Sequence, residues 1–140
     1  MSNQHIPHQD LREALQAVLV APSVLALATG GVVDALKDAP SYPAVRVVVR
    51  GRPVGAIAGH GIWECEAEID IYSAYGGTAE AMQVANVIVG LLNLQPLTVS
   101  GWTVIEMSVQ DLVPLEDELV GEVTVNRWQV PVLIHAERAA

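Results

Sequence analysis

The feature that most constrains the fold of this 140-residue chain is a stretch of strict alternation between apolar and charged side chains. The stretch runs from Trp63 to Tyr72. One set of alternate residues is Trp63, Cys65, Ala67, Ile69 and Ile71, and the other is Glu64, Glu66, Glu68, Asp70 and Tyr72. Successive side chains of a strand point to opposite faces of a sheet, so this period of two predicts a strand with one buried and one charged face.

Hydrophobic patterns elsewhere predict six further elements. Apolar residues at helical spacing indicate a helix from Asp10 to Pro22 and a short helical turn from Ser23 to Gly30. Alternation predicts strands over 45–50, 102–109 and 123–135, and small apolar residues at helical spacing predict a helix over 78–94. Pro131 cannot donate a ladder hydrogen bond, so we expect the last strand to lie at an edge or to be bulged there.

These elements predict a single α+β domain over residues 10–140, with a mostly antiparallel four-stranded sheet packed against helices. Residues 1–9 are polar and contain Pro7, so we expect a flexible N-terminal arm. The four glycines of residues 51–61 predict a mobile loop or a long hairpin connection. Residues 114–122 read PLEDELVGE and predict an acidic, exposed hairpin arm.

The charge balance argues against a protein that binds nucleic acid through its phosphates. Seven Lys and Arg residues stand against sixteen Asp and Glu, which gives a net charge of −9. An acidic surface repels phosphate, although an acidic conduit would let DNA slide without sticking. Cys65 is the single cysteine, which excludes an intrachain disulfide. The apolar runs are too short to span a bilayer, and we expect no membrane association.

The acidic row Glu64, Glu66, Glu68 and Asp70 is the most conspicuous chemical feature of the sequence. Carboxylates suit Ca²⁺ or Mg²⁺, but residues on one face of one strand spread along about 20 Å and do not converge on one ion. If residues 44–52 pair antiparallel with 63–72, Arg46, Arg50 and Arg52 face these acids as cross-strand ion pairs. We favour this structural interpretation over a metal site.

No catalytic motif is present in the sequence, and we expect neither an enzyme nor a cofactor. Nucleophile-elbow and phosphate-loop patterns are both missing. Tryptophan is enriched where subunits meet, so Trp102 and Trp128 are candidates for contacts in an assembly. Arg46, Arg50 and the acidic row are candidates for a subunit interface or for the lining of a lumen.

Several segments, taken in order, resemble a known family. LREALQAVLVAPSVLALATGGVVDAL resembles an opening helix with a short helix and a Gly-rich turn, and YPAVRVVV resembles a Pro-led first strand. IWECEAEIDIYSAYGGTAEAMQVANVIVGLLN resembles a strand, a glycine turn and an Ala-rich helix. The closing strands, through VNRWQVPVLIHAE, resemble a last hairpin. Together they resemble the tail-completion, or tail-terminator, proteins of siphophages, prophages and gene transfer agents.

The resemblance implies a structural virion protein located in the tail and assembled in the host cytoplasm. Such proteins form a ring, commonly hexameric, on the head-proximal end of the tail tube. The ring ends tube polymerisation and joins the head–tail connector, while DNA passes through its pore without specific binding. Two other hypotheses stay open: a head–tail connector or head-completion component, and a small ligand-binding α/β domain that uses loop 51–61 and the acidic strand.

Overall fold

The computed structural model describes residues 6–35, 41–54, 62–74 and 79–139. The helices are α1 (His8–Leu19), α2 (Pro22–Leu25) and α3 (Ala79–Leu92). The strands are β1 (Gly31–Val32), β2 (Ala44–Pro53), β3 (Ile62–Ser73), β4 (Thr98–Val99), β5 (Trp102–Val109), β6 (Val113–Val120) and β7 (Val123–Arg138). None of the described helices is long and apolar enough to cross a membrane.

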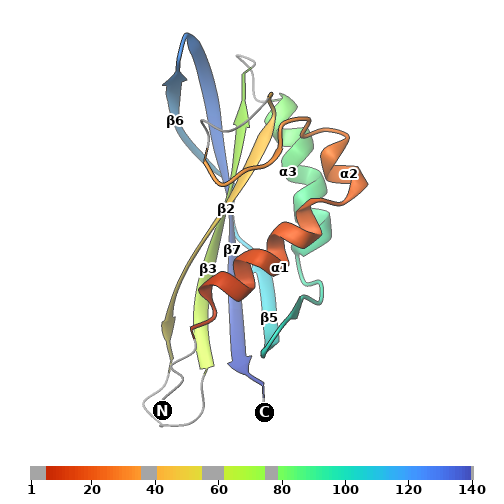
Figure 1. Ribbon diagram of the computed structural model, residues 1–140, viewed down its shortest axis with the longest axis vertical. Helices are drawn as coiled ribbons and strands as arrows, with labels where there is room; N and C mark the ends of the chain where they lie inside the picture. Colours follow the sequence, from red (N-terminus) through yellow and green to blue (C-terminus); the bar gives the residue numbers. More distant parts are fainter. Residues whose placement is uncertain (1–5, 36–40, 55–61, 75–78, 140) are drawn as a thin grey trace.

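The strands form one curled sheet that dominates the molecule (Figure 1). Its order is β1-β2-β3-β7-β5-β4, and β6 pairs with β7 beyond the end of β5. All neighbours are antiparallel except β1 and β2, which are parallel. The helices are few and lie on one side of the sheet, where α1 contacts β2 and α3 contacts β3, β5 and β7.

The expectation of a four-stranded, mostly antiparallel sheet packed against helices is therefore wrong. The sheet has seven strands among the described residues and is mixed. The additional strands are β1 and β4, each of two residues, and β6, which is formed by most of the acidic 114–122 segment. Two-residue strands exist only because a neighbour fixes them, so they leave no periodic pattern in the sequence.

The position of Pro131 also differs from the expectation. β7 is a central strand, paired with β3 on one side and with β5 and β6 on the other. The Pro131 carbonyl accepts a hydrogen bond from the Gln110 amide at 2.8 Å, in the stretch between β5 and β6. The N–H and C=O of one strand residue point to the same side, so the missing N–H faces a place where the partner strand is interrupted.

The core forms where the apolar face of β3 meets the helices. Cys65, Ala67, Ile69 and Ile71 are fully buried. They lie beside apolar residues of β2 and β7 in register, for example Val47 and Val130 on either side of Ile69. From the helices, the fully buried residues include Leu11, Leu15, Leu19, Ala81, Ile88 and Leu92. A buried Leu or Ile side chain contributes about 2 kcal/mol, so this one-sided strand anchors the domain.

The termini of the predicted elements shift modestly. α1 begins at His8 rather than at Asp10, and β7 continues to Arg138. The predicted N-terminal arm, residues 1–9, falls in part on residues 1–5, which lie outside the described residues. Loop 51–61 is shortened because β2 extends to Pro53, and its residues 55–61 also lie outside the described residues.

Glycine is required where the segments that precede β1 and β2 approach each other. A Cβ on Gly30 would lie 1.9 Å from the backbone oxygen of Ser41, whereas a Cβ on Gly90 of α3 would meet nothing within 4 Å. We expect Gly30→Ala to lower the free energy of unfolding by about 3 kcal/mol, because backbone must move. The control Gly90→Ala should raise it by about 1 kcal/mol, since alanine favours a helix.

Urea denaturation followed by circular dichroism measures both changes. If Gly30→Ala were as stable as the wild type, the close approach of residues 30 and 41 would be contradicted.

Candidate functional site

The face of the sheet opposite the helices carries polar side chains, and we call it the charged face. It is built by alternate residues of β2, β3 and β7, whose pairing places Asp70 between Arg46 and Gln129, and Glu64 between Arg52 and His135. The residues of the charged face are Arg46, Arg50, Arg52, Glu64, Glu66, Glu68, Asp70, Tyr72, Arg127, Gln129 and His135.

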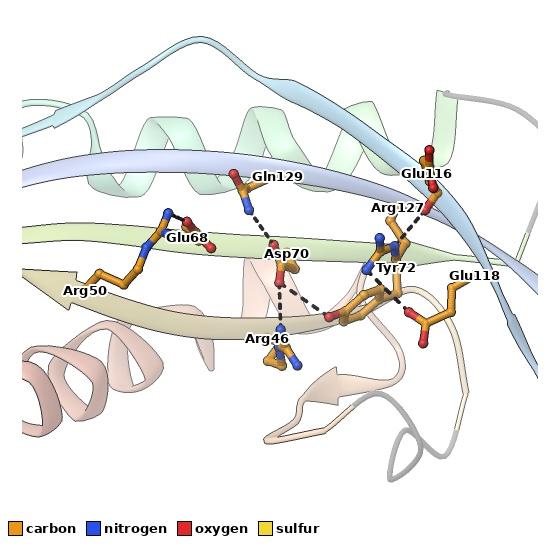
Figure 2. Close-up of polar contacts among 9 residues, drawn as sticks. All are labelled: Arg46, Arg50, Glu68, Asp70, Tyr72, Glu116, Glu118, Arg127 and Gln129. Carbon is orange, nitrogen blue, oxygen red and sulfur yellow. Dashed lines mark hydrogen bonds and ion pairs between the residues drawn. The ribbon is translucent and has the colours of Figure 1, made fainter.

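Asp70 is the centre of the hydrogen-bond network on this face (Figure 2). It is only 4% exposed and accepts from the Arg46 guanidinium at 3.3 Å and from the Gln129 amide at 3.2 Å. The Tyr72 hydroxyl donates to the same carboxylate at 3.5 Å. These three donors, one of which is a cation, compensate for the loss of water around this carboxylate.

The remaining acids of the row pair with the outer arginines. Arg50 forms an ion pair with Glu68 and lies 3.8 Å from Glu66. Arg52 lies 3.7 Å from Glu64, which also lies 3.4 Å from Nε2 of His135. The expected cross-strand pairing of arginines with acids is therefore confirmed, and the acids are largely balanced within one chain.

Burial sets the ionisation of two groups next to this network. Burial, and then the charge of Asp70, raises the pKa of Tyr72 to about 12. Burial, and then the charge of Glu64, raises the pKa of Cys65 to about 11. Both groups therefore stay protonated near neutral pH, and Cys65 is a core residue rather than a nucleophile.

A second polar cluster lies on β6 and the turn that follows it, residues 113–122, which we call the acidic arm. Arg127 of β7 holds this hairpin by donating from Nε to the Glu116 carbonyl at 2.8 Å and pairing with Glu118 at 3.4 Å (Figure 2). Asn126 donates to Asp117 at 3.0 Å. The acidic segment is thus an exposed hairpin, as its sequence indicated.

The two candidate tryptophans have different environments. Trp102 is 5% exposed and its indole N–H donates to Asp10 of α1 at 3.2 Å, so it packs inside the subunit. Trp128 is half-buried against the core, and its indole N–H donates to Asn126 at 2.8 Å. Of the two, only Trp128 keeps substantial surface for a contact with another chain.

The described residues contain no group of three or more His, Cys, Asp or Glu side chains placed to hold a metal ion. The acidic row runs along β3, as the spacing argument required. Glu64, Glu66 and Asp70 each lie opposite an arginine of β2, whereas Glu68 lies between Val48 and Pro131. What sequence reasoning missed is the contribution of β7. The sequence signal for it was a set of polar residues at alternate positions of this strand: Arg127, Gln129 and His135. That signal identifies the site only once β7 is known to pair with β3.

Comparisons with known proteins agree with this architecture. The family model described as Tail completion protein gp17 matches residues 13–130. A chain in a solved structure titled "Virion of native gene transfer agent (GTA) particle" is similar in fold, with a TM-score of 0.71 and 16% sequence identity. The match covers 92% of this chain and 96% of that chain. No curated protein matches in sequence.

The Asp70 network predicts an uneven response to removal of carboxylates. Asp70→Ala should lower the free energy of unfolding by about 2 kcal/mol, because it leaves Arg46 and Gln129 without their acceptor. The matched control Glu66→Ala should change it by less than about 0.5 kcal/mol, since its ion pair is exposed. Equal effects in urea denaturation would contradict the central role of Asp70.

The raised pKa of Cys65 predicts a loss of stability in alkali. The unfolded thiol ionises near the ordinary cysteine pKa of 9.0, whereas the folded thiol stays protonated up to about 11. Its stabilising contribution is thus complete below pH 9 and disappears as the pH rises towards 11. Urea denaturation at several pH values between 9 and 11 should show a smaller fall in the free energy of unfolding for Cys65→Ala than for the wild type. An equal fall in both proteins would contradict the raised pKa of Cys65.

Proposed function

Because this chain belongs to the Tail completion protein gp17 family of phage tail structural proteins, we propose that it forms a ring on the head-proximal end of a tail tube. The ring, most simply a hexamer, ends tube polymerisation and joins the tube to the head–tail connector. The protein is then a component of the tail of a phage or phage-like particle, assembled in the host cytoplasm.

The observation that carries the proposal is the extent of the family match. Residues 13–130 include every helix and strand of the fold except the start of α1 and the end of β7. Likeness in fold to a chain of a gene transfer agent virion over 92% of the present chain supports a role in a particle.

The architecture suits a ring because a closed ring needs two different surfaces on each subunit that fit each other. The charged face, the helix side and the projecting acidic arm differ in charge and shape, and the arm extends beyond the body of the sheet (Figure 1). Such asymmetry favours head-to-tail contacts over a two-fold dimer.

The charge suits a conduit for DNA. A net charge of −9 repels phosphate, so DNA is expected to pass the ring without binding to it. The role is structural and needs neither a cofactor nor catalysis. The candidate interface residues Arg50 and Trp128 remain available for contacts in this assembly, since both reach the surface.

The experiment that tests the ring measures mass and tube capping together. Light scattering coupled to gel filtration should find a discrete species of about six times the 14.9 kDa subunit mass, alone or after mixing with tubes of the cognate tail tube protein. Electron microscopy should show protein at one end of each tube and tubes that stop growing.

Two results would contradict this function. A protein that stays monomeric and does not touch tubes is not a tail terminator, and a gain in thermal stability with a metabolite or cation would then favour a ligand-binding domain. Density on isolated heads instead of tube ends would favour a head-completion component.

A further inference from the structure

Within the described part of the chain, one edge of the sheet is open along most of β2. Among the described strands, only β1 lies beside this edge, and it pairs with the first two residues of β2. The Val45 carbonyl accepts from the Val33 amide across the edge, and β2 pairs with β3 without a bulge. Because backbone groups alternate in direction along a strand, the N–H and C=O of Val47, Val49 and Gly51 point away from β3.

A hollow of about 390 Å³ lies beside this edge. Its lining includes Ile6 and His8 from the start of the chain and residues 46–49 of β2. Two buried polar atoms of this lining, Nδ1 of His8 and Nε of Arg46, have no hydrogen-bond partner among the described residues. Buried polar groups are nearly always paired, so within the described part of the chain these two atoms are available to a further hydrogen-bond partner.

The open edge is also basic where it reaches solvent. The side chains of Arg50 and Arg52 are 66% and 77% exposed, and their ion pairs with acids of β3 are of the weak, hydrated kind. We call residues 46–53 the basic edge. Among the described residues, it offers backbone groups that no strand pairs, together with two exposed cations.

The acidic arm presents the complementary surface. Its outer edge is not paired by any strand in the described part of the chain, because β6 pairs only with β7. Its acids, all exposed, are Glu116, Asp117, Glu118 and Glu122. Leu119 is 68% exposed on the same hairpin, so the arm holds an apolar side chain that its own subunit leaves uncovered.

One subunit cannot bring these two surfaces together. β3 and β7 lie between β2 and β6 in the sheet. The arm extends from one end of the sheet, whereas β2 ends at the opposite end (Figure 1). Pairing of the basic edge with its own copy would place arginines against arginines, which is repulsive.

We infer that the acidic arm of one subunit docks along the basic edge of the next, with β6 adding as a strand outside β2. The contact is heterologous, so it repeats around a closed ring. Backbone hydrogen bonds supply affinity, and the pairing of acids with Arg50 and Arg52 sets the direction. This inference rests on the proposed ring and names the surfaces that close it.

A charge swap tests the electrostatic part of the contact. Arg50→Glu/Arg52→Glu and Glu116→Lys/Asp117→Lys should each weaken assembly at least about tenfold, measured by light scattering across a dilution series. Mixing the two variants, or combining all four changes in one chain, should restore assembly. Arg138→Glu, at an exposed position at the end of β7, makes the same charge change as Arg52→Glu alone and should have no effect.

A backbone variant tests the strand addition separately. Val49→Pro removes an N–H that points away from β3, so the β2–β3 ladder is kept while the added strand loses a donor. We expect it to block assembly, whereas the matched control Val49→Ala, which loses side-chain packing but keeps the N–H, should assemble. Thermal unfolding of the monomer checks that both variants fold. If Arg50→Glu/Arg52→Glu does not fold, Arg52→Glu alone replaces it in the charge test.

The outcomes separate this contact from the ring itself. Wild-type assembly that neither the charge reversals nor Val49→Pro weakens would overturn the contact and leave the ring in place. A wild type that never assembles, alone or on tubes, would overturn both. Loss of assembly with rescue by the charge swap is the result that the contact requires.

Discussion

The pairing of β3 with β7 holds the rest of the structure in place. β3 matches β7 residue by residue from Ile62 to Ser73, and together they separate an apolar layer from a charged one. α1 and α3 cover the apolar side, while β2 brings its arginines to the other side because its register with β3 is fixed by the same alternation. A slip of one residue would exchange the two faces, so burial of Ile69 and its neighbours also specifies where every charge lies.

The separation of an apolar face from a charged face explains how this fold can be shared at 16% sequence identity with a chain of a gene transfer agent virion. What the fold needs is the alternation of apolar and polar positions and a few close approaches, such as the one at Gly30. Surface residues are free to vary, and they are the ones that meet other components of a particle. Membership of the tail completion family is therefore compatible with a charged face and an arm of individual character.

Local patterns predicted the long elements and the part of the charged face that lies on β2 and β3. The alternation over residues 63–72 identified β3 and the arginines that face it, because a half-buried strand has apolar and polar residues at alternate positions. Tertiary pairing supplied the rest. β1 and β4 are too short to have a period, Pro131 is tolerated only because its partner strand is interrupted there, and Gln129 and His135 join the site through the β3–β7 register. No pattern within one segment contains that information.

The sharing of β7 between core and arm has a thermodynamic consequence. Residues 123–129 of β7 pair with β6 of the acidic arm, and the same strand continues as the centre of the core. A partner that binds the arm also stabilises the first half of β7, which is paired with it. Binding that requires the folded arm shifts the folding equilibrium towards the folded state by mass action. If the arm binds a neighbouring subunit, as we propose, folding and assembly are linked equilibria and binding stabilises the folded subunit.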